Sequence, residues 1–472
     1  MAEARSRIDS GRPELAVPIY RSLLVAAPDD PRLLLNLTVA LFKAADYRDV
    51  IDVCHRLLKL DPSSVPASLF LGASHFQMGE PSGAVGPLQR VVARQPDERN
   101  ARLMLAESLV LLERHEDALP HFETAATLLA REPRVWYGLN RSYERVARAA
   151  ADRLFDRFPG NSFAHATRAR LYESQNDYRR AAYESRTALD GGGLDPHARR
   201  RVHVSLAAIN RHLAESGAPA ERSEPSGNLP PPCDEADQVC LFEAGRYADS
   251  VRAGRANEDP RSLYWRSEAY HALAREALAR LEELPPSFQL FELRARRDAL
   301  RGSHRSAAVH WRQALSLAPD NRVLKAGLAS ALFASHDYDA AVDVLDELLR
   351  ADGASADWRL MRGSALLAIN QPDAAIPDLR EAARLAPDMK AAYAELGRAY
   401  LMANQPNQAI PPLRRILAAD EDGSYHYRIA VAYNRTGQAG EADRMLDRYR
   451  RLNVAAETRR RELEGRLTVP RR

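Results

Sequence analysis

The feature that most constrains this chain is a regular spacing of small residues and helix-ending prolines. One set of small residues recurs at intervals of 34 in the C-terminal half, at Ala307, Ala341, Ala375 and Ala409. The same interval separates a second set near the N-terminus, at Ala16, Val50, Ala84 and Ala118. A small residue lets two helices approach closely, and a proline cannot continue a helix. The spacing predicts a stack of helix pairs, since a single amphipathic helix cannot bury its apolar face alone.

One copy of the repeat is clearest between residues 387 and 420. Its first helix carries Tyr393-x2-Leu396-Gly397-x2-Tyr400, and its second carries Ala409-x3-Leu413. A further match is Trp136-x2-Leu139-Asn140-x2-Tyr143, with asparagine where glycine is usual. These motifs resemble the tetratricopeptide repeat family, in a multi-repeat member of bacterial type. The resemblance implies an all-α fold, a right-handed α-solenoid of helix–turn–helix repeats.

The repeats are expected to form two arrays. Residues 1–214 form the N-terminal array, whose first repeat is incomplete, and residues 233–451 form the C-terminal array. Between them, residues 215–232 are rich in Pro, Ser and Gly, which indicates a flexible linker. Residues 452–472 are expected to form a polar, basic capping helix and tail.

Two stretches depart from the pattern, because no turn residue stands where one is due. They cover residues 133–158 and 260–284, and they align without a gap at an offset of 127. Under that offset Tyr143 meets Tyr270, and Ala147 meets an identical partner. We expect a long or sharply kinked helix at each site and an internal duplication above the level of the repeat. The alternative is simple drift in a tolerant array.

Composition limits the classes of function. The chain has 472 residues, of which 45% are hydrophobic and 28% charged, and its net charge is +3. This near-neutral balance argues against nucleic acid as a partner. No apolar run is long enough for a transmembrane segment. No phosphate-binding, dinucleotide-binding or nucleophile motif falls on a plausible strand, so we expect no enzyme activity, no cofactor, no metal and no small-molecule substrate.

The three cysteines leave one question open. Cys54 occupies an apolar helix position and is expected to be buried. If Cys233 and Cys240 share one helix, they lie about 10 Å apart along its axis, which is too far for a disulfide. If Cys233 folds back from the end of the linker, a bridge can form. Such a bridge requires an oxidising compartment.

The resemblance implies that first helices line a concave groove that binds peptides. Carrying the helical phase across gives a set of apolar and arginine residues for this groove. In order these are Leu35, Val39, Phe42, Leu69, Phe76, Tyr137, Arg141, Arg145, Arg170, Phe333, Leu360, Arg398, Met402, Tyr427 and Arg435. Apolar anchors beside arginine suit protein or peptide partners of apolar and acidic character. The alternative is that each of these residues only packs the inner layer.

Two functional hypotheses follow from these observations. The first is a non-enzymatic scaffold that binds peptide segments of partner proteins in its grooves. The second is an assembly or chaperone-like holder for exported or envelope proteins. Counting back from Ala16 places Met1 inside a first helix, so we expect the true start to lie upstream. The protein would then be cytoplasmic as the sequence is written, or periplasmic if an upstream segment holds an export signal.

Overall fold

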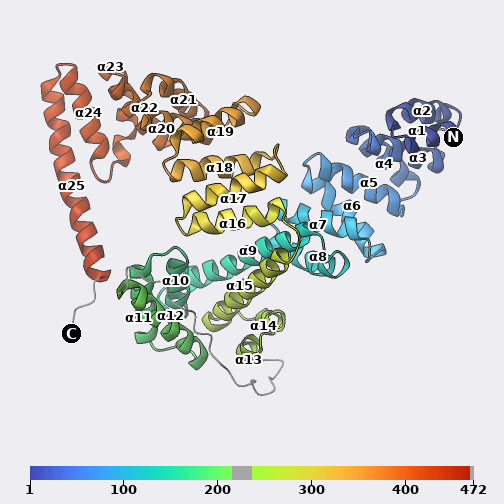
Figure 1. Cartoon of the computed structure of the whole chain (residues 1–472), viewed down its shortest axis with the longest axis horizontal. Coiled ribbons are helices and arrows are strands. Elements are labelled where there is room, and N and C mark those ends of the chain that lie inside the picture. Colours follow the sequence, from blue (N-terminus) through green and yellow to red (C-terminus); the bar gives the residue numbers. More distant parts are fainter. Residues whose placement is uncertain (215–236, 468–472) are drawn as a thin grey trace. The chain divides into compact units, whose positions relative to one another are not determined.

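The computed structural model describes residues 1–214 and 237–467, and within these ranges the chain is helical without strands. It divides into two compact units (Figure 1). Unit 1 contains Met1–Thr167, Gly191–Arg199 and Arg222–Pro285. Unit 2 contains Arg168–Asp190, Arg200–Glu221 and Pro286–Arg472. In each unit the helices stack in pairs along the chain, so the all-α solenoid of helical repeats is confirmed.

Unit 1 starts with four regular helix pairs and ends with two long helices and their neighbours. Its helices are α1 (Ala2–Asp9), the 3-10 turn η1 (Pro13–Leu15), α2 (Ala16–Ala26), α3 (Pro31–Lys43), α4 (Tyr47–Leu60), α5 (Val65–Gln77), α6 (Pro81–Arg94), α7 (Arg99–Leu111), α8 (His115–Leu128), α9 (Pro133–Arg157), α13 (Gln238–Glu243), α14 (Tyr247–Gly254) and α15 (Pro260–Glu282). Two helices are divided between the units, α10 (Ser162–Ser174) and α12 (Pro196–Ala214).

Unit 2 consists mainly of helix pairs from the C-terminal half. Its helices are α11 (Tyr178–Asp190), α16 (Phe288–Leu300), α17 (His304–Leu317), α18 (Arg322–Ala334), α19 (Tyr338–Ala351), α20 (Ala356–Ala368), α21 (Pro372–Leu385), α22 (Lys390–Met402), α23 (Pro406–Ile416), the 3-10 turn η2 (Leu417–Ala419), α24 (Ser424–Arg435) and α25 (Ala439–Leu467).

The ends of the first helices repeat in register with the sequence period. The N-caps of α3, α5, α7 and α9 are Asp30, Ser64, Glu98 and Glu132, and each side chain accepts hydrogen bonds from the first turn. The left-handed residues that end α3, α5 and α7 are equally regular, with φ of 59° at Ala45, 72° at Gly79 and 58° at Glu113. A left-handed residue lets the chain reverse after a helix, which creates the turn of each repeat.

Glycine appears where the two helices of a pair touch. A Cβ built on Gly72 of α5 would lie 2.6 Å from Leu88 Cγ of α6, and one on Gly397 of α22 would lie 2.5 Å from Leu413 of α23. Both partners are fully buried. A larger side chain would push the helices apart, so the repeat needs glycine at this position.

The two turn-less stretches are continuous helices, as the sequence predicts. α9 has 25 residues and α15 has 23. The next left-handed residue after Glu113 is due at position 147, but Ala147 lies inside α9 and is completely buried. α9 and α15 pack side by side within unit 1 and make the most extensive helix–helix contact there (Figure 1).

The paired helices run antiparallel, and equivalent residues meet at their crossing. The rings of Tyr143 and Tyr270, which are 127 positions apart, lie 6.0 Å from each other. His271 Nδ1 lies 3.0 Å from Glu144 Oε2, another pair with the same offset. Asn140 Nδ2 donates to the carbonyl of Ala274 at 2.8 Å. Contact between equivalent residues is the mark of a two-fold arrangement, here within one chain.

Several expectations about domain organisation remain predictions. The linker 215–232 and Cys233 lie outside the described residues, so the linker and the Cys233–Cys240 bridge stay predictions. The array boundaries 1–214 and 233–451 differ from the two compact units, because segments of the chain alternate between units. The expected terminal helix is not separate from the last repeat: α25 runs unbroken from Ala439 to Leu467.

Candidate functional site

The candidate site in unit 1 is the surface formed by the first helices α3, α5, α7 and α9, here called the first-helix surface. Positions 34 residues apart lie at the same level on successive helices. One such level reads Leu35, Leu69, Leu103 and Tyr137, and another reads Val39, Ala73, Glu107 and Arg141. The chemistry therefore changes along the surface, from apolar on α3 and α5 to charged and aromatic on α7 and α9.

The apolar part is built by five of the predicted residues. Leu35, Val39, Phe42, Leu69 and Phe76 are all half-buried. Phe42 is held in place by edge contacts with Phe70 at 5.3 Å and Tyr47 at 5.5 Å between ring centroids. Leu35 and Phe42 also pack against the core of the first repeats. These side chains thus pack the inner layer and still present apolar area to solvent, and their role in binding a peptide remains a prediction.

A partly buried ion pair marks the change from apolar to charged side chains along the surface. Glu107 of α7 accepts from Arg134 of α9, with Arg134 Nε 2.9 Å from Glu107 Oε1. Burial raises the pKa of Glu107, and the hydrogen bond and charge of Arg134 act in the opposite direction. The pair fixes the start of α9 against α7, which positions the charged end of the surface.

The two arginines of α9 that the sequence predicts at the groove, Arg141 and Arg145, have different partners. Arg141 donates to the hydroxyl of Tyr137 at 3.2 Å, and its guanidinium lies 5.4 Å from the centre of the same ring. Arg145 is exposed and pairs with Glu113 at the end of α7. In the ranges 1–214 and 237–467, Arg141 has no carboxylate partner. Arg141 is therefore an arginine of this surface that is available for an acidic group.

Arg170 does not belong to the same unit as these residues. It lies in the part of α10 that is grouped with unit 2, whereas Tyr137, Arg141 and Arg145 belong to unit 1. Its role at the same groove remains a prediction.

The predicted residues of unit 2 are spread over α18, α20, α22 and α24. Phe333 and Leu360 are half-buried and pack on the core, while Met402 and Tyr427 are exposed by 38% and 50%. Arg398 pairs with Glu395 at 3.0 Å, and Arg435 donates to the carbonyl of Leu401 at 2.8 Å. Both arginines are thus partly engaged by their own unit.

Sequence reasoning missed two residues of the first-helix surface. Glu107 and Leu111 both lie on α7, and Leu111 is 61% exposed. Counting 34 residues back from Arg141 and Arg145 gives these two positions. The signal was therefore present in the repeat register, although it does not reveal that Arg134 pairs with Glu107.

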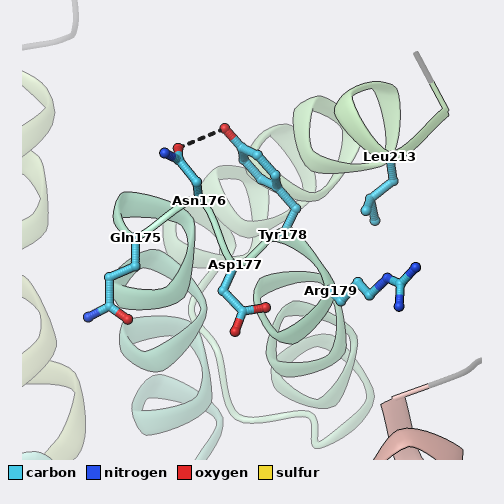
Figure 2. Close-up of a pocket in the computed structure, with 6 residues that line it drawn as sticks. All are labelled: Gln175, Asn176, Asp177, Tyr178, Arg179 and Leu213. Carbon is cyan, nitrogen blue, oxygen red and sulfur yellow. Dashed lines mark hydrogen bonds between the residues drawn. The ribbon is translucent and has the colours of Figure 1, made fainter. Parts of the chain in front are cut away.

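A pocket in unit 2 contains none of the predicted residues. Figure 2 shows its lining at the turn between α10 and α11 and the end of α12, formed by Gln175, Asn176, Asp177, Tyr178, Arg179 and Leu213. The Tyr178 hydroxyl donates to Asn176 Oδ1 at 3.0 Å, and the Asn176 amide donates to the carbonyl of Arg301 at 2.7 Å. These polar groups already have partners, so the pocket is a weak candidate for a ligand site.

Among the described residues, no three His, Cys, Asp or Glu side chains are grouped so that they could hold a metal ion. Over the same residues, no helix combines the length and the apolar character needed to span a membrane.

Comparison with known families identifies the repeat. One family profile described as tetratricopeptide repeat matches residues 1–65, 69–133 and 360–424. A second profile with the same description matches residues 299–364, and together the matches cover more than half of the chain. The chain belongs to the tetratricopeptide repeat family. Tetratricopeptide proteins bind other proteins or peptides and are typically non-catalytic.

Individual proteins are similar to parts of this chain at low identity. The DnaJ homolog subfamily C member 3 homolog of Dictyostelium discoideum is 24% identical over 204 residues, which cover 38% of this chain and 40% of that protein. The chain therefore matches less than half the length of this relative. Among solved structures, MamA from Desulfovibrio magneticus RS-1 is 24% identical (TM-score 0.34; 36% of this chain, 96% of MamA). YrrB, described as a tetratricopeptide protein with an unusual peptide-binding site, is 20% identical (TM-score 0.32; 36% of this chain, 91% of YrrB).

Proposed function

We propose that this chain is a non-enzymatic scaffold whose first-helix surface in unit 1 binds a peptide segment of a partner protein. The observation that carries the proposal is the change of chemistry along one continuous set of helices. Half-buried apolar side chains lie on α3 and α5, and an arginine held over a tyrosine lies on α9. A segment with apolar residues followed by acidic residues matches this order.

The apolar side chains and Arg141 contribute differently to the binding of a peptide. The apolar side chains are already partly ordered by the core, so covering them costs little conformational entropy. Arg141 is oriented by Tyr137 and can form a charge-assisted hydrogen bond to a carboxylate. The apolar part provides affinity, and the arginine fixes the direction of the bound segment.

An array of synthetic peptides with varied apolar and acidic residues tests the proposal on the full chain. We expect peptides with an apolar half and an acidic half to bind best. Val39→Asp and Arg141→Glu should each weaken binding about tenfold, because one buries a charge and the other reverses one.

Matched controls separate binding from folding. Val25 is 82% exposed on the second helix α2, so Val25→Asp introduces the same charge away from the surface. Arg90 is exposed on the second helix α6, so Arg90→Glu repeats the other change away from the surface. If the controls weaken binding equally, or if no peptide binds the unaltered chain, the proposal is wrong.

A second candidate is a holder for unfolded or exported chains. The apolar part of the surface and the DnaJ-homolog name of one relative favour it. The same array distinguishes the two functions. A holder should bind purely apolar peptides as well as mixed ones, and Arg141→Glu should then have no effect.

A further inference from the structure

Unit 1 contains a group of side chains with more positive than negative charge, where the C-terminal end of α9 meets the N-terminal end of α15. This group is here called the Glu258 cluster and consists of Arg153, Arg157, Glu258 and Arg266. Glu258 lies just before α15 and receives hydrogen bonds from all three guanidinium groups. Arg266 Nη2 lies 2.8 Å and Arg153 Nη1 3.2 Å from its Oε1, and Arg157 Nη1 lies 3.0 Å from its Oε2. Three positive charges therefore share one negative charge.

The three arginines are not equivalent. Arg266 has a side chain that is only 7% exposed, and it also donates to the carbonyl of Arg255 at 3.1 Å. Its hydrogen bond lowers the pKa of Glu258, to which the charges of Arg153 and Arg157 add, so the carboxylate stays ionised near neutral pH. Arg266 and Glu258 thus form one complete ion pair, and the charge of the other two arginines is left over.

Arg153 and Arg157 are the part of the cluster that faces solvent. Their side chains are 42% and 55% exposed. They stand four residues apart, so both project from the same face of α9. Each has five N–H groups and gives one hydrogen bond to Glu258, which leaves donors available at one place. Asp152 and Asp156 also lie on α9, and Asp156 is three residues from Arg153, but among the described residues the carboxylate that pairs with Arg153 and Arg157 is Glu258.

We propose that the Glu258 cluster is a second interaction surface, which binds an acidic segment of a protein partner. A carboxylate of the partner would occupy the open side of Arg153 and Arg157 opposite Glu258, where paired guanidinium groups present a planar set of donors. The surface is separate from the first-helix surface, whose residues on α9 are Tyr137, Arg141 and Arg145. The proposal therefore does not depend on peptide binding there.

The alternative is that the arginines only fasten α9 to the start of α15. Removal of Glu258 distinguishes the two roles. If the cluster is only structural, Glu258→Gln lowers stability and changes no binding. If it receives acidic segments, Glu258→Gln removes the competing carboxylate, and an acidic probe should bind severalfold more tightly.

Fluorescence anisotropy with a labelled oligoglutamate peptide and the full chain provides the test. We expect salt-sensitive binding, about tenfold weakening in Arg153→Gln/Arg157→Gln, and tightening in Glu258→Gln. The control is Arg148→Gln/Arg275→Gln, which removes the same charge from two exposed, equivalent positions of α9 and α15. Unchanged binding in this control supports the cluster.

Three results would overturn the proposal. These are no binding to the unaltered chain, equal loss in the control, or a Glu258→Gln variant that is less stable and binds no more tightly. Val39→Asp should leave oligoglutamate binding unchanged, so a failure of the first-helix surface is distinguishable from a failure of this one. Circular dichroism and thermal unfolding of each variant confirm that it is folded.

Discussion

The regular pair α5–α6 and the long helix α9 differ at one position of the repeat. In α5–α6 the chain reaches Gly79 with φ of 72°, reverses, and α6 covers the first helix. In α9 the corresponding Ala147 stays helical and is buried, and α15 lies against the helix instead. The comparison teaches that a repeat can lose its turn if another part of the chain supplies the missing apolar cover. Here that part is the equivalent helix of the duplicated segment.

The largest effect should come from breaking the continuity of α9. Ala147→Pro removes one helix hydrogen bond and brings the ring against the preceding turn, so we expect a loss of about 3 kcal/mol or more. Urea unfolding followed by circular dichroism measures it. The control is Arg99→Pro, at the first position of α7. The helices α3, α9 and α15 already have proline at their first position. That control should cost little. Equal losses in both variants would contradict the importance of continuity.

A charge exchange tests whether the α9–α15 pair is two-fold in character. His271→Glu places two carboxylates together at the crossing and should cost about 0.5–1 kcal/mol. The exchanged variant Glu144→His/His271→Glu should recover the loss, because equivalent positions face each other. A double-mutant cycle from thermal unfolding measures the coupling. If the exchanged variant is as unstable as the sum of its single changes, the two positions are not interchangeable.

An effect of similar or smaller size should change sign between two sites of the same substitution, alanine to glycine. Ala45 has φ of 59°, a conformation that favours glycine, so Ala45→Gly should raise stability by a few tenths of a kcal/mol up to about 1. Ala147 is helical and buried, so Ala147→Gly should lower stability by about 1 kcal/mol. Thermal unfolding of both variants checks the signs. The same sign at both positions would show that the register of turns does not govern stability.

Much of the fold could be predicted from the repeat alone. The interval of 34 places the helix pairs, and the absence of a turn residue after Tyr143 and Tyr270 predicts two long helices. The pairing of those helices could not be predicted, since contacts between residues 127 apart leave no local pattern in a single sequence. The matching alanines at 147 and 274 were the available sign, because small residues suit close helix contact.

The candidate site was less predictable than the fold. Helical phase identified the apolar residues Leu35 and Phe76, since phase decides which side of a helix faces inward. It could not show that Glu113 engages Arg145 while Arg141 rests on Tyr137, because side-chain partners come from neighbouring helices. The excess of arginine around Glu258 could not be predicted from the sequence either, because it combines residues of α9 with a residue of the loop before α15.

The pairing of α9 with α15 has a consequence for how the protein forms during synthesis. Most contacts in a helical repeat join neighbours in the chain, so successive repeats can acquire structure as they leave the ribosome. α9 is different, because the part of its buried face that includes Tyr143 meets α15 only after α15 has been made. Until then an apolar face of the nascent chain stays uncovered, and completion of unit 1 depends on closing a loop of more than a hundred residues.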